Sequence, residues 1–344
     1  MPNAVVELKG CAHMAGWSTN CDFEIGGLSG DKGTYVRGSS KKDSGFTCSW
    51  TVGGANTDET FHGVINNMAS SCTRDGTVSI TKKGSGDWRV TGNNVYKGKT
   101  TINGGRLIVN GTHSGTGAVT VNNGGTLAGI GTLNAKVTVK NGGAVSPGDT
   151  LVQTTHTLKL KAGLTVEQGG IVAMPVKVST AGSATVCKLV VTGAMNINDA
   201  TLRLDIESGE ENIVEGTSFY LFNMANVSGV TGDGFTTIEP AVPGEGLAWD
   251  TSNLLTTGRL NVVSATAIET VEKSEVAVWP LTIENELHIT APTNVQATVY
   301  NLMGSVMDVV TVQNGEAIIN TSSYASNIYL VKVGDAKVFR VVKK

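Results

Sequence analysis

Asn103-Gly104-Gly105-Arg106-Leu107 begins a pattern that returns three times by residue 172. Each later copy has Asn or Gln, then two glycines, then an aliphatic residue two places after the second glycine. The glycine pairs are Gly104-Gly105, Gly124-Gly125, Gly142-Gly143 and Gly169-Gly170, and the aliphatic residues are Leu107, Leu127, Val145 and Val172. A pattern that recurs about every 20 residues is typical of a solenoid.

Each repeat predicts a strand, a corner and a second strand. An apolar-Thr-Val triplet precedes three of the turns, at 119–121, 137–139 and 164–166, and this alternation directs one face of a strand inward. Paired glycines permit the positive φ angles of a sharp corner. A coil of about 20 extended residues, at roughly 3.3 Å each, closes into one turn of a parallel β-helix with the four aliphatic residues in an internal ladder. The alternative is a meander of hairpins, but hairpins require no matching residues at this spacing.

The composition favours an all-β chain. The 344 residues include 44 Gly and only 7 Pro, with 16% charged and 5% aromatic residues, which suits many short strands and tight corners. The formal net charge of −3 gives no basic face, so we expect no nucleic-acid partner. No apolar run reaches the roughly 18 residues of a membrane-spanning helix.

The first residues read as a strand already under way. Residues 1–8 have neither the basic segment nor the long apolar core of a secretory signal peptide. Because a solenoid that begins in mid-coil exposes an unpaired strand edge, we expect these 344 residues to be the C-terminal part of a longer protein.

The five cysteines lack the spacing of a zinc site or of a disulfide framework. Cys48 and Cys72 are about one coil apart, and stacked positions about 4.8 Å apart are within disulfide reach. The sequence leaves open whether they pair or are small apolar residues of a ladder, and we favour the second interpretation.

Ordered blocks precede the first turn and include it. They are Gly27-Leu28-Ser29-Gly30, Trp50-Thr51-Val52-Gly53-Gly54, Lys83-Gly84-Ser85-Gly86-Asp87-Trp88, and residues 94–105, which read Asn-Val-Tyr-Lys-Gly-Lys-Thr-Thr-Ile-Asn-Gly-Gly. In this order they resemble the passenger-associated transport repeat of autotransporter-type surface proteins. The resemblance covers residues 26–262, where 246–260 is similar to the block that closes such regions, and it implies a surface-exposed β-helix. We expect the β-helix to span residues 1–265, with its best-defined coils at 94–172.

An insertion interrupts the period after Gly148. We interpret Asp149 to His156 as a looped-out segment, and loops of this kind are where solenoids carry function.

A second domain is expected at residues 266–344. Short β-type segments occur at 276–279, 286–290, 296–301, 306–312, 316–320, 328–333 and 336–342, separated by turns such as Asn314-Gly315 and Gly334-Asp335. So many strands in so few residues predict a small β-sandwich. The fold class is therefore all-β, a parallel β-helix followed by a small C-terminal β-sandwich.

The second domain resembles the C-terminal sorting domain of type IX secretion substrates in Bacteroidetes. The resemblance rests on Glu286-Leu287-His288-Ile289, residues 299–304 and Ile328-Tyr329-Leu330-Val331-Lys332-Val333, with a basic end. It implies that the type IX secretion machinery reads this domain and that the domain is usually removed after export. The residues that we assign to the signal are Gly304, Tyr329, Lys332, Gly334, Lys337, Arg340, Lys343 and Lys344.

The sequence pattern does not bring catalytic residues together. Glycoside hydrolysis needs two carboxylates roughly 5 to 9.5 Å apart, but Glu167 stands alone beside a turn, Asp149 lies in the insertion, and the other acidic cluster is the single loop 207–211. The five histidines have no partner at metal-ligand or triad spacing. We therefore predict no catalytic, cofactor-binding or metal-binding residues and no cofactor.

We predict a non-catalytic, adhesin-type stalk, secreted or held at the cell surface, with surface polysaccharide or host glycans as possible ligands. The alternative is a carbohydrate-active enzyme or glycan-binding groove. The alternative requires three or more acidic or basic side chains to meet on one exterior face.

Overall fold

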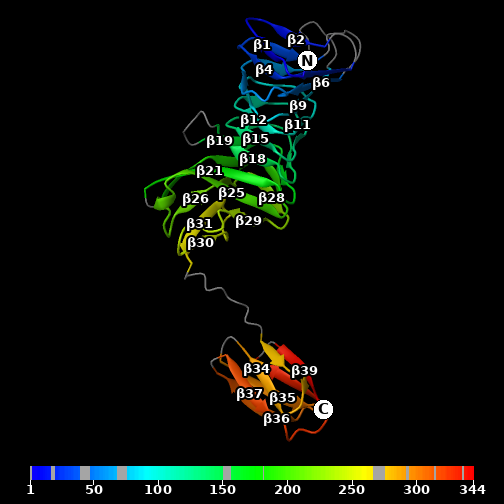
Figure 1. The fold of residues 1–344 in the computed structure, drawn as a ribbon, viewed down its shortest axis with the longest axis vertical. Coiled ribbons are helices and arrows are strands. Elements are labelled where there is room, and N and C mark those ends of the chain that lie inside the picture. Colours follow the sequence, from blue (N-terminus) through cyan, green and yellow to red (C-terminus); the bar gives the residue numbers. More distant parts are fainter. Residues whose placement is uncertain are drawn as a thin grey trace. The chain divides into compact units, whose positions relative to one another are not determined.

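The computed structural model describes residues 2–16, 20–38, 47–67, 76–149, 156–180, 182–265, 276–291, 294–313, 315–334 and 337–344. The chain divides into two compact units, Met1–Ala265 and Thr266–Lys344 (Figure 1). Apart from one 3-10 turn at Glu210–Asn212, the described residues contain no helix.

The first unit is a stack of coils whose strands form long parallel sheets, with successive coils in successive rungs (Figure 1). Sheet 1 consists of β1 (Val5–Leu8), β4 (Gly27–Gly30), β7 (Glu59–Phe61), β10 (Asp87–Val90), β12 (Gly105–Val109), β15 (Gly125–Gly129), β18 (Ala144–Pro147), β21 (Ile171–Thr180), β25 (Ala200–Ser208) and β29 (Phe235–Glu239), with β22 (Ser183–Val186) antiparallel to β21. Sheet 2 consists of β3 (Cys21–Ile25), β6 (Thr47–Val52), β9 (Thr77–Lys82), β11 (Thr100–Ile102), β14 (Val119–Val121), β17 (Val137–Val139), β20 (Leu164–Val166), β24 (Gly193–Ile197) and β28 (Val227–Thr231). This is a parallel β-helix, as the sequence predicts.

Shorter strands make the third side of each coil. They are β2 (His13–Ala15), β5 (Tyr35–Arg37) and β8 (Val64–Asn66) in one sheet, and β13 (Thr112–His113), β16 (Thr132–Leu133), β19 (Thr157–Leu160), β23 (Lys188–Val191) and β27 (Phe222–Asn223) in another. Asn94 joins the two sheets, because its side-chain oxygen accepts a hydrogen bond from the amide of Ile65 at 2.8 Å and its backbone bridges to His113.

Identical positions of successive coils stack in register. Sheet 1 pairs Leu107 with Leu127, Leu127 with Val145 and Val145 with Val172, and all four side chains are buried in the core of the first unit. On sheet 2 the residues that flank each central threonine, such as Val119 and Val121, point into the same core. Each buried aliphatic side chain stabilises the coil by roughly 1.5 to 3 kcal/mol.

The glycine turns bring the backbones of neighbouring coils into contact. Gly142 has a φ of 70°, which glycine adopts without strain. Gly143 has no room for a side chain, since a Cβ there would lie 2.6 Å from the carbonyl oxygen of Val121. The amide of Gly124 donates to the carbonyl of Gly142 at 3.0 Å, and the amide of Gly142 donates to that of Gly169 at 2.9 Å. The first glycine of these turns therefore sets the corner, and the second permits the coils to approach.

The earliest of the four turns is built differently. At Asn103-Gly104-Gly105 the second glycine, Gly105, has the positive φ of 57°, whereas Gly104 does not.

An antiparallel sheet covers the end of the apolar interior after the last coils. It consists of β26 (Ser218–Tyr220), β31 (Arg259–Ser264) and β30 (Leu247–Asp250). Its side chains Phe219, Leu260 and Val262 are at most 1% exposed and belong to the same core as the coils. These strands include the block at residues 246–260 that resembles the end of autotransporter repeat regions.

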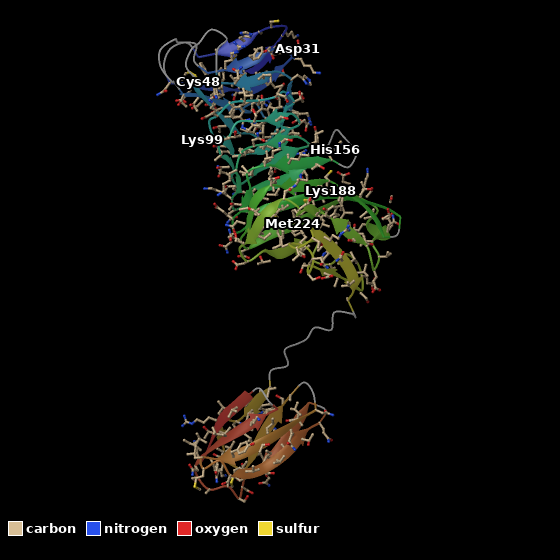
Figure 2. The ribbon with its side chains drawn as sticks, turned by 180° about the vertical axis from the view of Figure 1, so that it is seen from behind. Asp31, Cys48, Lys99, His156, Lys188 and Met224 are labelled. Atoms are coloured by element: carbon tan, nitrogen blue, oxygen red, sulfur yellow. A yellow bond between two sulfur atoms is a disulfide. The ribbon has the colours of Figure 1, made fainter. Side chains whose placement is uncertain are left out.

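Cys48 forms a disulfide with Cys21 of the preceding coil, where the two residues are in register (Figure 2). The interpretation of Cys48 as an unpaired ladder residue is wrong, and so is its pairing with Cys72, which itself lies outside the described residues. On the other side of Cys48 the register position belongs to Val78, because the long coils of this region do not keep the short period of residues 94–172.

The second unit is a β-sandwich. One sheet consists of β32 (Ala277–Trp279), β34 (Glu286–Thr290) and β37 (Glu316–Asn320), and the other of β33 (Thr282–Ile283), β39 (Lys337–Lys343), β38 (Ile328–Val333), β35 (Val295–Asn301) and β36 (Val306–Val312). The sheets enclose a core of their own that includes Leu287, Val299 and Val331. Strand β33 was not among the segments expected from the sequence, since two residues carry no periodicity.

We predict that Leu127→Asp destabilises the first unit by several kcal/mol, because it buries a carboxylate between Leu107 and Val145. Thr120→Asp on the half-exposed outer side of β14 should cost under about 1 kcal/mol. Thermal unfolding followed by circular dichroism measures both variants. Equal melting temperatures for the two would contradict the ladder.

Candidate functional site

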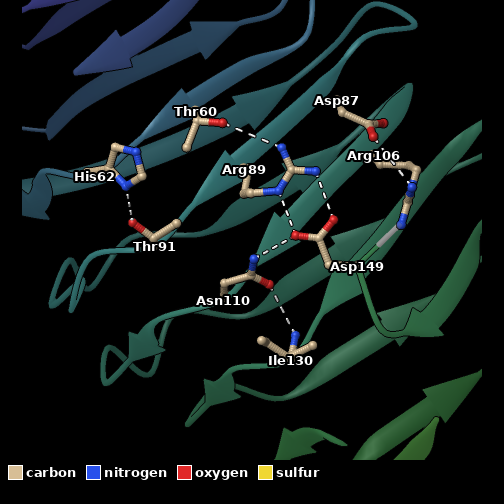
Figure 3. A network of polar contacts seen from close by, with 9 residues as sticks. All are labelled: Thr60, His62, Asp87, Arg89, Thr91, Arg106, Asn110, Ile130 and Asp149. Atoms are coloured by element: carbon tan, nitrogen blue, oxygen red, sulfur yellow. Dashed lines mark hydrogen bonds and ion pairs between the residues drawn. The ribbon is translucent and has the colours of Figure 1, made fainter. Parts of the chain in front are cut away.

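Charged side chains gather on the outer face of sheet 1, across β10 and β12 (Figure 3). Strand alternation points Trp88 inward and Asp87 and Arg89 outward, and the register places Arg106 beside Asp87. Asp149 reaches the same face from beyond β18. The four charged groups that meet here are the cluster that the enzyme alternative requires, so their contacts decide what they can do.

Arg89 and Asp149 form a buried, two-pronged ion pair. The guanidinium donates from Nε to Oδ2 at 2.6 Å and from Nη2 to Oδ1 at 2.8 Å, the geometry that gives the strongest side-chain hydrogen bonds. The Asp149 side chain is 1% exposed and that of Arg89 is 11% exposed. Hydrogen bonding to Asp149 raises the pKa of Arg89 above its ordinary value.

Asn110 completes this network. Its amide nitrogen donates to Oδ2 of Asp149 at 2.7 Å, and its oxygen accepts a hydrogen bond from the amide of Ile130 at 3.3 Å. Arg89 also donates to the hydroxyl of Thr60 at 3.4 Å. The network therefore ties together residues from five successive coils, and it fixes the point at which the chain leaves the coil after Gly148.

Asp149, the first residue of the segment interpreted as a looped-out insertion, is itself buried against sheet 1. Asp149 folds back onto sheet 1 because Arg89 neutralises it there. At the other end of the insertion, the carbonyl of His156 accepts a hydrogen bond from the amide of Lys188 at 2.8 Å (Figure 2). Residues 150–155 lie outside the described part of the chain.

The outer face of sheet 1 is covered, not open, at this level. Ile108 is in register with Arg89, and Ala128 is in register with Ile108. Both residues point away from the main core, yet both are 0% exposed. The second ion pair, Arg106 Nη1 to Asp87 Oδ2 at 3.4 Å, leaves both side chains at most 25% exposed. The cluster thus consists of charges that neutralise one another over a covered surface, which favours a structural role.

We predict that Arg89→Leu lowers the free energy of unfolding by about 3–5 kcal/mol, because the buried Asp149 carboxylate loses its charged partner. Arg203→Leu is a matched control, since Arg203 pairs with Asp205 at 2.7 Å but both side chains are about 40% exposed, and it should cost under about 1 kcal/mol. Chemical denaturation measures both. A loss no larger than that of the control would show that the pair does not hold the coils.

Lys82 occupies an interior position that the sequence did not single out. The register places it between Val52 and Ile102 on the inner face of sheet 2, and it is 1% exposed. Its Nζ donates to the carbonyls of Lys83, Gly84 and Gly104 at 2.7, 3.0 and 3.1 Å, so every ammonium proton has an acceptor. Burial lowers the pKa of Lys82 to about 8. Its contact with Gly104 lies at the turn whose φ pattern differs from the others.

His113 is a second buried titratable group inside the β-helix. It is 3% exposed and stacks on Tyr96 with 4.2 Å between ring centroids, and both ring nitrogens are buried. Burial lowers the pKa of His113 to about 4. A cavity of about 10 Å³ lies beside the two rings, enough for about one water molecule.

We predict that stability falls with acid because of His113. Its folded-state pKa lies below the unfolded value of 6.5, so the unfolded chain takes up the proton first. The contribution is complete above about pH 6.5, falls by about 3 kcal/mol as the pH drops towards 4, and is level below that. His113→Phe keeps the stack on Tyr96 and removes the titration, so its unfolding free energy should fall less over this range. Parallel pH profiles of the two proteins would contradict this assignment.

The residues assigned to the sorting signal do not converge on one point. Lys332 and Arg340 are exposed on the outer face of the five-stranded sheet, whereas Tyr329 is 3% exposed and donates from its hydroxyl to the carbonyl of Ala325 at 2.9 Å. Gly304 and Gly334 lie in turns after β35 and β38, which are antiparallel neighbours, so they are at opposite ends of the sandwich. Lys337 and Lys343 are the first and last residues of β39, and Lys344 follows.

Within the described ranges, no group of three or more His, Cys, Asp or Glu side chains is placed to hold a metal ion. In the same residues, no helix has the length and apolar character needed to cross a membrane.

Two family models match parts of this chain. Residues 80–109 match the passenger-associated-transport-repeat, and residues 277–344 match the secretion system C-terminal sorting domain. The first match covers Lys82, Arg89 and the turn at Gly104, and the second covers nearly all of the β-sandwich. The chain therefore carries both modules that its sequence resembles.

The chain is also similar to a curated surface protein. It is 48% identical over 79 residues to the adhesin BmaC autotransporter of Brucella suis biovar 1 (strain 1330). The match covers 23% of this chain and 2% of that adhesin, so the chain spans a small part of its relative's length. The repeat and the sorting domain together make this a secreted, cell-surface β-helical protein.

Proposed function

We propose that the β-helix is a non-catalytic, adhesin-type stalk and that the β-sandwich is its export signal for the type IX secretion machinery. The observation that carries this proposal is the succession of a passenger-type repeat and a sorting domain in one chain. The repeat belongs to surface-exposed passengers, and the sorting domain supplies a reason for a second core that the β-helix does not need.

The geometry of the first unit supports a stalk. Backbone hydrogen bonds and stacked aliphatic residues join each coil to its neighbours, and stability in such a chain is approximately a sum of neighbouring interfaces. A continuous core of this kind can keep a rod rigid without any local binding site in it. The charged groups on the outer face of sheet 1 form ion pairs with one another, as Arg89 and Asp149 do.

The recognition surface that we propose is the outer face of β38 and β39. Lys332 and Arg340 extend from this face, next to the exposed Val338, and they combine positive charge with an apolar surface. Tyr329 contributes by holding the sandwich together, because its side chain is in the core. Gly334, with a φ of 60°, turns β38 towards β39.

A carbohydrate-active enzyme or a glycan-binding groove is the second candidate. The cluster of Asp87, Arg89, Arg106 and Asp149 favours it, since four charged groups do meet on one exterior face. The covered surface at Ile108 opposes it, because a polysaccharide needs an open groove. Activity assays on pectin and other acidic glycans distinguish the two candidates. If the protein is an adhesin-type stalk, it binds surface polysaccharide or host glycans without cleaving them.

We predict that Thr266–Lys344, fused behind a signal peptide and an unrelated folded reporter, carries the reporter to the surface of a type IX-competent host. Surface labelling and protease accessibility of intact cells measure export. The variant Lys332→Glu/Arg340→Glu should lower the exported fraction, whereas Val309→Ala on the neighbouring β36 should not.

Retention of the reporter in the periplasm, while an established sorting domain exports it, would contradict the export role. The sandwich would then be a module of the stalk itself.

A further inference from the structure

One side of the first unit carries lysine and arginine but no carboxylate along its strands. This side is formed by the shorter strands β13, β16, β19, β23 and β27, and it continues into β26 and β31 of the antiparallel sheet that covers the core. The strands adjoin directly, because the amide of Leu189 donates to the carbonyl of Leu221 at 3.0 Å and the amide of Leu221 donates to that of Gly258 at 2.9 Å. None of these strands contains Asp or Glu.

The cations on these strands point outward. Lys159 is exposed and stands between two leucines that are 0% exposed. Lys188 and Arg259 each precede a buried residue, so both side chains point away from the core. The register pairs Thr157 with Lys188 and Lys159 with Val190, which makes the two lysines diagonal neighbours on one face. These positions are scattered in the sequence, so the net charge of −3 gives no sign of a basic surface, and only the stacking of coils creates one.

Tyr220 holds two of these cations in place. Nζ of Lys188 lies 4.4 Å from the centre of its ring, and Cζ of Arg259 lies 4.9 Å from it. Arg259 also donates from Nη1 to the hydroxyl of Ser218 at 3.4 Å. Among the described residues neither cation forms an ion pair, unlike Arg203, which pairs with a carboxylate. A cation–π contact orients a charged side chain without neutralising it, so both cations can still bind an anion.

Asp250 bounds this surface. It is the last residue of β30, and β31 separates β30 from β26. Its carboxylate accepts a hydrogen bond from the amide of Ser252 at 2.9 Å, and hydrogen bonding to Ser252 lowers the pKa of Asp250. The positive surface therefore extends from β19 to β31 and ends at β30.

We propose that this basic face, made of Lys159, Lys188, Tyr220 and Arg259, binds an acidic polysaccharide through the carboxylates of its uronate sugars. A guanidinium binds a carboxylate with two parallel hydrogen bonds, and an ammonium adds a point charge. Because Tyr220 already orders two of the cations, binding loses less side-chain freedom. Asn261, on the same outer side of β31 as Arg259, has an amide group of the kind that binds sugar hydroxyls.

A nucleic acid is the competing polyanion. Duplex DNA carries one charge per about 1.7 Å of its axis, and it requires a denser row of cations than the basic face supplies. The chain's net charge of −3 also repels so dense a polyanion. A uronate polymer carries a carboxylate on each sugar with hydroxyls between them, which suits a few spaced cations beside polar side chains.

This inference rests on the proposed adhesin-type function, for which it names the class of ligand. The basic face lies in the first unit, so a chain that has lost its sorting domain keeps it.

The test measures equilibrium binding of the purified 344-residue chain to immobilised polygalacturonate. Fully methyl-esterified polygalacturonate, which has the same backbone without the charges, is the matched polymer. The protein should bind polygalacturonate, bind it more weakly as salt is added, and not bind the methyl ester. Duplex DNA and poly-L-glutamate are the competing polyanions, and both should bind more weakly than polygalacturonate.

Variants locate the site. Lys188→Gln/Arg259→Gln should weaken binding by about tenfold, and each single substitution by about threefold. Tyr220→Leu should weaken it by about threefold, because the cations lose the ring that orients them, whereas Tyr220→Phe should keep the affinity. Lys136→Gln/Lys140→Gln is the matched control, since these exposed lysines flank β17 on sheet 2, and it should change the affinity by less than about twofold. Melting temperatures check that each variant is folded, and the single substitutions replace the double variant if it is not.

The proposal is overturned if the chain binds neither polymer, or both equally. It is also overturned if Lys188→Gln/Arg259→Gln weakens binding no more than the control does. Tighter binding of duplex DNA or poly-L-glutamate, lost in the same variant, would assign the basic face to a nucleic acid or an acidic peptide. Each of these failures leaves surface export of the reporter unaffected. Cleavage of polygalacturonate would contradict the non-catalytic stalk, while the variants still report on the basic face, so the two proposals fail separately.

Discussion

The close approach of neighbouring coils at the glycine turns is the constraint on which the first unit depends. At Gly143 a single added carbon would meet the carbonyl of Val121 at 2.6 Å, so this corner can stack on its neighbour only with glycine at its second position. Once the corners stack, hydrogen bonds run from turn to turn. The aliphatic residue that follows at a fixed distance is then placed above its counterpart. Backbone geometry at the corner thus sets the side-chain register of the sheets.

Lys82, Arg89 and Asp149 are buried charged groups that are tied to the backbone of this framework or to one another. The ammonium of Lys82 donates hydrogen bonds to three carbonyls near a turn, and the guanidinium of Arg89 donates to the carboxylate of Asp149. In each case a buried charge is stable because it is paired or fully hydrogen-bonded. His113 is uncharged instead, because burial lowers its pKa and so keeps the ring neutral over most of the pH range. These buried charged groups therefore stabilise the fold of the β-helix, and the covered face of sheet 1 is poorly suited to catalysis.

The sandwich divides its surface between two chemistries. Lys332 and Arg340 lie on the five-stranded sheet, and Trp279, Glu286 and Glu316 lie on the three-stranded sheet. Because the two sheets pack face to face through one core, the outer faces point in opposite directions. A domain arranged in this way presents a basic surface on one side and an acidic, aromatic surface on the other.

The sequence by itself determined the β-helix, the sandwich and the two modules that the family models match. Those signals are local: a two-residue alternation, a glycine corner and their return about every 20 residues. It did not determine the partner of Cys48, the burial of Asp149, the interior place of Lys82 or the meeting of Lys188 and Arg259 at Tyr220. Each of these joins residues that are distant in the chain, and the register between strands decides which residues meet. Coil length sets that register. In the coils before residue 94 the length varies, and no period in the sequence marks where the strands lie. The tertiary structure alone therefore decided which charges neutralise one another and which side chains remain exposed to a ligand.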